Sequence, residues 1–313
     1  MADEAQLSPF VFACQGGLVL DQSTFAMQPG MALELQNFEP DISGGYRRIS
    51  GYAKWNTNIV PQTAASTEPV LMVALFNSKV IAARGTKIYE AGTTGSWSEI
   101  DTGRTSAGRY TFFRYNLAGT DFIIWADGAN HATKYDGTTL TDINASGAPA
   151  NPKFVTGFKD HLFFAGMSST PQQLTFTAPF TDNDFQTSNG AGTIKVDSNI
   201  TGLFPFRDAL FIFCEERIFK LTGSALADFA IQPVTREIGC LNGFTIQEFA
   251  GDIVFLGPDG LRTVAGTERI GDVELGTISR PVQKRFQELT DVDEFTSLVI
   301  PDKTQYRIFF SNA

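Results

Sequence analysis

The sequence predicts an all-β fold: a β-propeller of about five to six four-stranded blades, with an extended N-terminal arm and one short inserted helix. The main observation is a repeat, in which a short turn containing Asx or Gly precedes a run of β-branched and aromatic residues. Its anchors are spaced by 42, 39, 48, 44 and 53 residues and are Lys79, Asp121, Asp160, Asp208, Asp252 and Gln305. Repeats of about 40–50 residues are typical of propeller blades, which bury their apolar faces against their neighbours.

The composition supports many short strands joined by turns. The chain has 28 Phe but only 3 Trp and 7 Tyr, and aromatic residues suit the half-buried surface of a sheet. The 29 Gly and 14 Pro provide the turns between strands. A hydrophobic content of 42% is sufficient for a substantial core.

The net charge of −10 is spread along the chain rather than concentrated in one region. Residues 1–150 hold 10 basic and 14 acidic side chains, and residues 151–313 hold 14 and 20. Binding to a phosphate backbone requires clustered Lys and Arg, so this distribution argues against specific nucleic-acid binding. An acidic surface serves solubility, and it would also let DNA pass without sticking.

The odd set of three cysteines, Cys14, Cys214 and Cys240, predicts free buried thiols in a reducing compartment rather than a disulfide framework. The first ten residues lack the pattern of a signal peptide. No apolar run approaches 18 residues, so we expect no membrane-spanning segment.

Two regions are expected along the chain, an N-terminal docking arm over residues 1–55 and the propeller over residues 56–313. The arm combines short strand-like stretches with the Gly44-Gly45 turn before YRRISGY. Blades are predicted to start near 70, 111, 154, 201, 244 and 295. Because the chain stops just after the sixth anchor, either the last blade is incomplete and the arm supplies its missing strands, or the sequence is a fragment.

Two segments interrupt the strand pattern. Helical spacing of Ile278, Val282, Phe286 and Leu289 predicts a helix of about three turns, with Ser279 as its N-cap. The stretch 176–196 in the third blade is predicted to form a long loop on one rim of the propeller, where repeat proteins place sequence variation and contacts with partners.

No residue pattern predicts a catalytic or metal site. His131 and His161 each fall in a turn, without cysteines or carboxylates at metal-ligand spacing. Asp182 and Asp184 form a D-x-D pair that could hold Ca²⁺, although solvated loop acids are commoner. We therefore expect no cofactor. Trp125 is expected in the core, and Trp97 could be an exposed aromatic platform.

The arm motif resembles the nozzle or tail-hub (tubular B-like) proteins of short-tailed bacteriophages and their cyanophage relatives. The residues of the arm that match this family are Gly16-Gly17-Leu18, Pro29-Gly30, Leu35, Asn37, Pro40, Gly44-Gly45, Arg47-Arg48 and Gly51. Two later stretches also match, GDIVFLGPDGLRTV (251–264) and ISRPVQ (278–283).

The resemblance implies a structural role in the virion tail rather than an enzymatic one. The protein would be made in the host cytoplasm and would form a homo-oligomeric ring, with a hexamer favoured. Its partners would be a tail adaptor or other tail proteins, and DNA would pass through the ring during genome ejection without specific binding. The residues expected to serve assembly and docking are Gly44, Gly45, Tyr46, Arg47, Arg48, Asp182, Asp184 and Phe185.

Two alternatives remain from the sequence. A propeller binding module of a tail or baseplate would recognise a host glycan or a partner protein through rim loops such as 176–196. A propeller glycoside hydrolase would need paired carboxylates near the central channel, for which Asp182, Asp184, Glu215 and Glu216 are the candidates.

Overall fold

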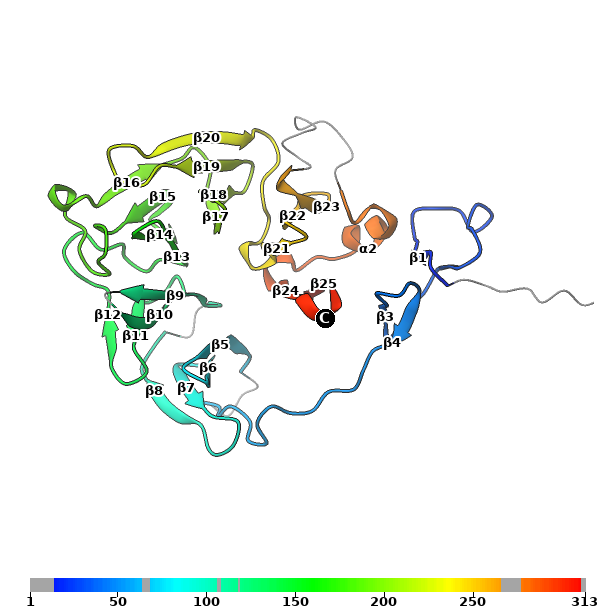
Figure 1. Ribbon diagram of the computed structural model, residues 1–313, viewed down its shortest axis with the longest axis horizontal. Helices are drawn as coiled ribbons and strands as arrows, with labels where there is room; N and C mark the ends of the chain where they lie inside the picture. The colour runs from blue at the N-terminus through cyan, green and yellow to red at the C-terminus, as the bar shows by residue number, and fades with distance from the viewer. Residues whose placement is uncertain (1–13, 64–67, 106–107, 118, 266–276, 311–313) are drawn as a thin grey trace, which may run out of the picture.

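The chain is an all-β propeller, as the sequence predicts. The computed structural model describes residues 14–63, 68–105, 108–117, 119–265 and 277–310. Six antiparallel sheets follow one another around a centre in chain order, and the N-terminal segment lies beside the last of them (Figure 1).

The first four sheets have four strands each, joined in sequence order as meanders. The first comprises β5 (Val70–Phe76), β6 (Lys79–Arg84), β7 (Lys87–Ala91) and β8 (Ser98–Asp101). The second comprises β9 (Thr111–Leu117), β10 (Thr120–Ala126), β11 (Thr133–Tyr135) and β12 (Leu140–Asp142). The third comprises β13 (Phe154–Phe158), β14 (His161–Met167), β15 (Thr170–Phe176) and β16 (Gly192–Lys195). The fourth comprises β17 (Ile200–Phe206), β18 (Ala209–Cys214), β19 (Ile218–Thr222) and β20 (Ala230–Thr235).

The last two sheets are smaller than the four-stranded blades expected. The fifth has β21 (Gln247–Phe249), β22 (Asp252–Gly257) and β23 (Gly260–Thr263), and the sixth has β24 (Thr296–Ile300) and β25 (Gln305–Phe309). Thr277 forms an isolated antiparallel bridge with Arg262 at the edge of the fifth sheet. Residues 266–276, between β23 and this bridge, lie outside the described residues.

The repeated sequence pattern is the hairpin between the first and second strands of a sheet. Two-residue loops make this connection in the first sheet, where Phe76 pairs with Lys79, and in the third, where Phe158 pairs with His161. In the first loop Asn77 and Ser78 both have positive φ, of 47° and 61°. Two positive φ angles give the turn a twist that matches that of the strands, which explains why Asx and Gly recur here.

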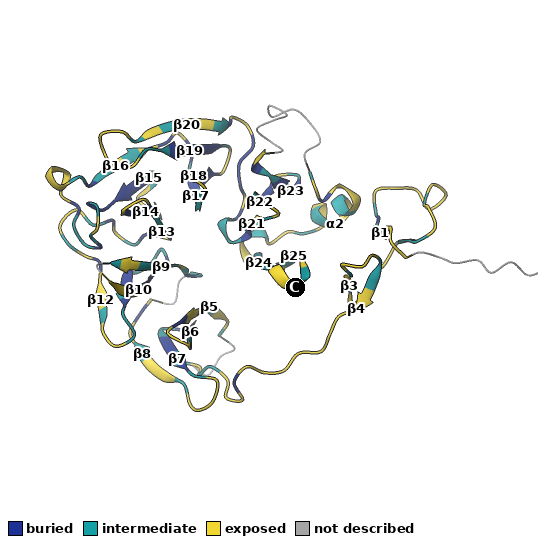
Figure 2. Cartoon of the chain, viewed as in Figure 1, coloured by how far each residue is buried: buried dark blue, intermediate teal, exposed yellow. Residues whose placement is uncertain are grey.

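The second strands are continuous apolar runs because they are buried on both faces. In β10, Ile123 and Trp125 pack toward the first sheet, whereas Ile124 and Ala126 pack toward the third. These four residues are fully buried, whereas Thr120 and Asp121 at the start of the strand are exposed (Figure 2). A strand covered on both sides loses the apolar–polar alternation of a half-exposed strand.

Five apolar clusters join the six sheets in pairs: first to second, second to third, third to fourth, fourth to fifth, and fifth to sixth. Among the described residues, no such cluster joins the sixth sheet to the first. The ring of apolar packing is therefore open between these two sheets.

The inserted helix is shorter than the sequence predicts. A 3₁₀ turn, η3 (Arg280–Val282), leads into α2 (Gln283–Gln287), which has five residues. Ser279 does not cap it, because its hydroxyl accepts a hydrogen bond of 3.0 Å from the backbone N–H of Leu261 on the fifth sheet. Phe286 and Leu289 pack against the cluster between the fifth and sixth sheets, so α2 covers that junction.

The N-terminal segment contains two small sheets separate from the blades. Strands β1 (Gly17–Leu18) and β2 (Met31–Ala32) are parallel, and β3 (Phe38–Pro40) and β4 (Tyr46–Arg48) form an antiparallel hairpin. Other short helices that lie wholly within the described residues are η1 (Thr187–Asn189), η2 (Gly243–Thr245), η4 (Val292–Glu294) and η5 (Pro301–Lys303). Within the described parts of the chain, no helix has both the length and the apolar character needed to cross a membrane.

Candidate binding site

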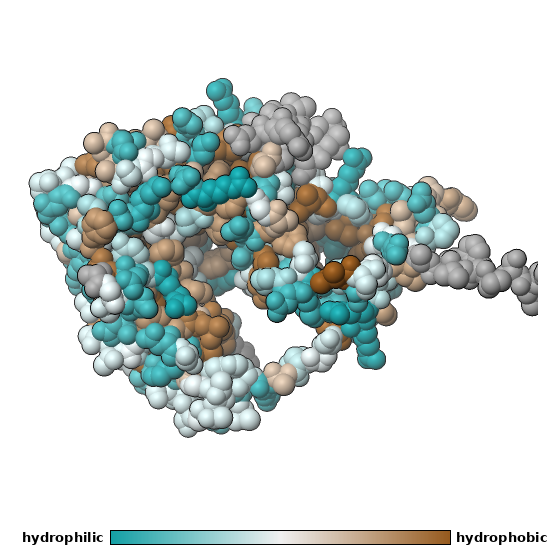
Figure 3. All heavy atoms as spheres, viewed as in Figure 1, coloured by the Kyte–Doolittle hydropathy of each residue, from teal (hydrophilic) through white to brown (hydrophobic). Residues whose placement is uncertain are grey.

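A cavity of about 1090 Å³ lies at the centre of the propeller. The first strands of the sheets, or the residues just before them, supply its walls, so every sheet contributes to it. A central channel is usual in a propeller, and here it extends to Val73 and Leu298 at the opening between the first and sixth sheets. Figure 3 shows this opening, with apolar atoms along its margin.

The wall that faces the opening is apolar and exposed. On β5, Val73 and Leu75 are 61% and 62% exposed, while Ala74 and Phe76 on the opposite face are buried in the cluster with the second sheet. Across the opening, Leu298 on β24 is also exposed. Val73 and Leu298 both line the cavity. Val73, Leu75 and Leu298 are therefore exposed in the region where two neighbouring sheets of a closed ring would pack against each other.

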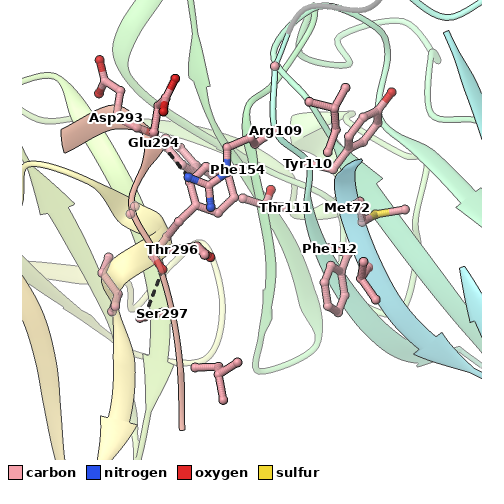
Figure 4. Close-up of a pocket in the computed structure, with 18 of the residues that line it drawn as sticks. Met72, Arg109, Tyr110, Thr111, Phe112, Phe154, Asp293, Glu294, Thr296 and Ser297 are labelled. Atoms are coloured by element: carbon pink, nitrogen blue, oxygen red, sulfur yellow. Dashed lines mark hydrogen bonds between the residues drawn. The ribbon is translucent and has the colours of Figure 1, made fainter. Parts of the chain in front are cut away.

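Arg109 is the cation in the cavity wall, and its side chain bridges two sheets (Figure 4). Its Nη1 donates hydrogen bonds to the backbone carbonyls of Phe295, at 2.6 Å, and Asp293, at 3.2 Å. The guanidinium stacks on the ring of Phe244, 3.8 Å from its centroid. Burial lowers the pKa of Arg109, and the nearby carboxylate of Glu294 opposes that effect. Because its donors serve backbone carbonyls, Arg109 ties the start of the second sheet to the entry of the sixth.

Polar bonds fix the sixth sheet to the fifth. Asn242 donates to the carbonyls of Val292 and Phe295, at 2.6 and 3.0 Å, and the hydroxyl of Tyr306 donates to the carbonyl of Thr245 at 2.8 Å. Burial raises the pKa of Tyr306 to about 12, so the phenol stays a donor at physiological pH. The sixth sheet is therefore fixed to the fifth. On its other face Leu298 stays exposed, whereas Gln305 and Arg307 contact the N-terminal segment.

The chain before β5 covers the outer part of the first sheet. Asn56 donates to the carbonyls of Gly92 and Gly95, and Arg84 donates to the carbonyl of Val60 at 2.5 Å. Ala82, paired with Val73 on this face, is fully buried. The segment does not cover Val73 and Leu75 on the first strand of this sheet, which stay exposed.

The arm residues predicted to dock do contact other elements, within the same chain. Gly44 and Gly45, with φ of 98° and 82°, form the turn of the β3–β4 hairpin. The hydroxyl of Tyr46 donates to the carbonyl of Gly30 at 2.6 Å, which ties this hairpin to β1–β2. Arg47 forms an ion pair of 2.9 Å with Glu39 across the hairpin.

Arg48 is exposed at the end of β4. Tyr46 and Arg47 thus contact residues of their own chain. That the arm also binds other proteins during assembly stays a prediction.

The predicted docking residues of the third sheet hold their own loop in place. Asp182 is buried and forms an ion pair with Lys134 of the second sheet. Asp184 accepts hydrogen bonds from the backbone N–H of Gln186 and from the Asn189 amide, which lowers its pKa. Phe185 is buried in the cluster between the second and third sheets. A partner could reach Phe185 only if the loop rearranged.

Other sequence candidates also lie away from the cavity. Asp182, Asp184, Glu215 and Glu216 do not line it, contrary to what the hydrolase alternative requires. His161 lies in β14 rather than in a turn and is buried, with Nδ1 at 2.6 Å from the carbonyl of Thr177. Groups of three or more metal-ligating side chains do not occur among the described residues.

The tryptophans and cysteines take structural positions. Trp125 is fully buried, as predicted. Trp97 is half-buried and donates to the carbonyl of Asn58 at 3.0 Å, so it anchors the chain before β5 rather than forming an open platform. Cys214 and Cys240 are free and buried, as expected, whereas Cys14 is free but exposed, contrary to the prediction.

Sequence reasoning missed the cavity wall, although a signal was present. The run VLMVALF in β5 has apolar residues on both faces, which predicts a first strand covered on both sides. The structure covers one face and leaves Val73 and Leu75 exposed on the other. An apolar run without a matching buried neighbour indicates a binding surface.

No protein-family model matches the chain, and no curated protein sequence does. Among solved structures, the chain is similar to the extracellular domain of the two-component system BT4673 from B. thetaiotaomicron, at 14% identity and a TM-score of 0.48. That similarity covers 72% of this chain and 31% of the other, so the chain spans about a third of that domain.

Two further solved structures show weaker similarity. The AfRom2 CNH domain is 9% identical with a TM-score of 0.44, over 63% of this chain and 68% of the other. YCF48 bound to D1 peptide is 11% identical with a TM-score of 0.42, over 64% of this chain and 65% of the other. At these scores the fold assignment rests on the chain's own six sheets.

Proposed function

We propose that this chain is a non-enzymatic binding module that takes an apolar segment of a partner protein into the opening between its first and sixth sheets. The observation that carries the proposal is the uncovered pair of apolar faces, with Val73 and Leu75 on one side and Leu298 on the other. All other neighbouring sheets are joined by apolar clusters. A partner segment in this place would complete the packing that the chain lacks here.

The chemistry of the walls favours a protein segment over a glycan. Sugar recognition needs polar groups that are free to bond hydroxyls, together with aromatic faces. Here Nη1 of Arg109 already donates to two backbone carbonyls, and the guanidinium covers the face of Phe244, so this aromatic ring is not open to a sugar. Burial of one Val or Leu side chain contributes about 1.5–3 kcal/mol, so a few apolar side chains of a partner could overcome part of the cost of association.

The proposal assigns no chemistry to the cavity. Asp293 and Glu294 line it, but their neighbour Arg109 bonds the backbone rather than a carboxylate. Among the described residues that line the cavity, no nucleophilic side chain has an adjacent histidine or other free base. The walls are therefore suited to binding rather than to turnover.

The resemblance to phage tail proteins supplies one setting for such a module. In a tail, the partner would be another tail protein, and the acidic surface would not hold DNA strongly. A structural tail component remains a prediction from the sequence pattern. The binding surface described above does not depend on it.

Selection from a library of displayed 12-residue random peptides tests the binding proposal. We expect the enriched peptides to carry several apolar residues and to lose affinity more than tenfold against Val73→Asp. The matched control is Phe180→Asp, an exposed aromatic on the third-sheet loop away from the cavity, which should leave affinity within twofold. Both variants should retain the wild-type circular dichroism spectrum. Failure to enrich any peptide, or peptides indifferent to Val73→Asp, would refute the proposal.

A further inference from the structure

The N-terminal arm, residues 14–48, is held on the propeller by a small set of polar contacts. Glu39 on β3 pairs with Lys303 at 2.8 Å and with Arg307 on β25. The amide of Gln305 donates to the carbonyl of Pro40 at 3.0 Å, and the backbone N–H of Leu20 donates to the carbonyl of Pro281 at 2.7 Å. The β3–β4 hairpin occupies the place of outer strands beside the two-stranded sixth sheet, but its strands do not hydrogen-bond into that sheet (Figure 1).

The arm is joined to the propeller by an exposed tether. Residues 50–55 are all exposed and form no hydrogen bond with the described residues. The chain is fixed again only at Asn56, which bonds the first sheet. The tether can therefore change direction without breaking a hydrogen bond, while residues from Asn56 onward stay in place.

The arm also exposes more apolar surface than a docked terminal segment should. Phe25 is fully exposed, and Leu33, Phe38 and Ile42 are exposed as well. In the tether, Tyr52 is 96% exposed. Large apolar side chains repeated along one short segment indicate a surface that another chain covers.

From these three observations we propose that the arm is exchanged between copies of this chain, so that β3–β4 of one copy docks on the sixth sheet of another. Every copy carries both the Glu39 arm and the acceptor formed by Lys303 and Arg307, so exchange preserves each polar contact and needs no new complementary surface. The arms of two copies then lie close together and can cover one another's apolar side chains. Exchange of an identical element in this way is a low-cost route to an oligomer. The proposal does not depend on the proposed function, because it uses the outer part of the sixth sheet rather than the cavity.

The exchange can be tested on the wild-type sequence by zero-length crosslinking of a mixture of isotope-labelled and unlabelled chains. Chains labelled with ¹⁵N and unlabelled chains are unfolded together, refolded, and treated with a carbodiimide, which joins Lys303 directly to Glu39. Mass spectrometry should find crosslinks between a labelled and an unlabelled peptide. The control is the ion pair of Lys134 with Asp182 inside the propeller, whose crosslinks should join peptides of the same isotope only. Crosslinks of Glu39 to Lys303 confined to one isotope would overturn the proposal.

Charge exchange provides a second measurement. The arm variant, Glu39→Lys with Arg47→Glu, keeps the ion pair within the hairpin but places a positive charge opposite Lys303 and Arg307 of its own chain. The acceptor variant, Lys303→Glu with Arg307→Glu, places negative charges opposite Glu39 of its own chain. Each should be monomeric alone by sedimentation, and an equimolar mixture should form a heterodimer of twice the mass, because arm and acceptor match only between chains. If the mixture stays monomeric while a single chain with all four substitutions docks its own arm, the arm docks only within its own chain.

Discussion

The carboxylate of Glu39 lies 2.8 Å from Nζ of Lys303, although 264 residues separate them along the chain. The Glu39 side chain is only 3% exposed and also pairs with Arg47 and Arg307. One acidic residue of the arm thus gathers three cations from its own hairpin and from the sixth sheet. This is the main polar contact between the two ends of the described chain.

Arm docking should depend on pH through Glu39. Its hydrogen bond with Lys303 is the largest cause that lowers its pKa, and the pair with Arg47 adds to this. A carboxyl whose pKa falls on docking stabilises the docked state above its ordinary pKa of about 4.5 and loses that effect as the pH falls further.

Limited proteolysis within the arm, residues 14–48, whose contacts with the propeller are made by Leu20, Glu39 and Pro40, should therefore be slow and constant from pH 7 to about pH 5 and should accelerate below about pH 4. An acid-stable protease and a Glu39→Gln control are needed. The control should show fast cleavage at every pH, and a pH-dependent control would contradict the assignment.

Alanine substitutions at two nearby positions of the first sheet, Ile81 and Val73, should differ sharply in their effect on the free energy of unfolding. Ile81 is fully buried between the first and second sheets, so Ile81→Ala should lower the free energy of unfolding by about 2–5 kcal/mol. Val73, on the adjacent strand but facing the opening, is 61% exposed, so Val73→Ala should change it by no more than about 0.5 kcal/mol. Urea denaturation followed by circular dichroism measures both. A large loss for Val73→Ala would mean that another part of the chain covers this face.

Arg109 should stabilise the junction between the second and sixth sheets. Arg109→Ala removes the donor for the carbonyls of Phe295 and Asp293, and hydrogen bonds to charged groups contribute about 1.5–3 kcal/mol. We expect faster hydrogen exchange in β24, with little change in β14, the distant control. Arg109→Lys should rescue only in part, because an ammonium cannot reproduce the planar stacking on Phe244. Unchanged exchange in β24 would show that the polar bonds from Asn242 suffice.

The three thiols should react in two classes. Burial is the main cause that raises the pKa of Cys214 and of Cys240 to about 12, whereas Cys14 is exposed. Because the thiolate is the reactive form, a chromogenic disulfide reagent at pH 8 should titrate only Cys14 in the folded protein, and all three thiols in guanidinium chloride. The Cys14→Ser variant should give no reaction when folded. A rapid reaction at a second thiol would indicate local opening of the fourth or fifth sheet.

The sequence carries most of the fold because the repeat is local. A tight turn followed by a continuous apolar run needs only neighbouring residues to be recognised, and it predicts the first two strands of each sheet. The helix after the fifth sheet was harder to predict. The hydroxyl of Ser279, expected to cap it, instead bonds Leu261, a partner that spacing along the chain cannot reveal.

The candidate site was missed for a related reason, although the apolar run of β5 was a signal for one of its walls. Asp182 and Phe185 lie in a loop whose polar and aromatic residues suggest a contact surface. In the structure Asp182 forms an ion pair with Lys134, and Phe185 is buried in the apolar cluster between the second and third sheets. Val73 and Leu298 look like ordinary strand residues, and they become a surface only because no sheet packs on them.

By itself, the sequence determined that this protein is a propeller of repeated hairpins with an N-terminal arm, because turn chemistry and apolar runs act over a few residues. Only the tertiary structure decided where the ring of packing stays open, and that Glu39 of the arm meets Lys303 and Arg307 of the sixth sheet. Both features depend on which faces come together across hundreds of residues. Burial and charge pairing between such distant segments leave no periodic trace in the chain.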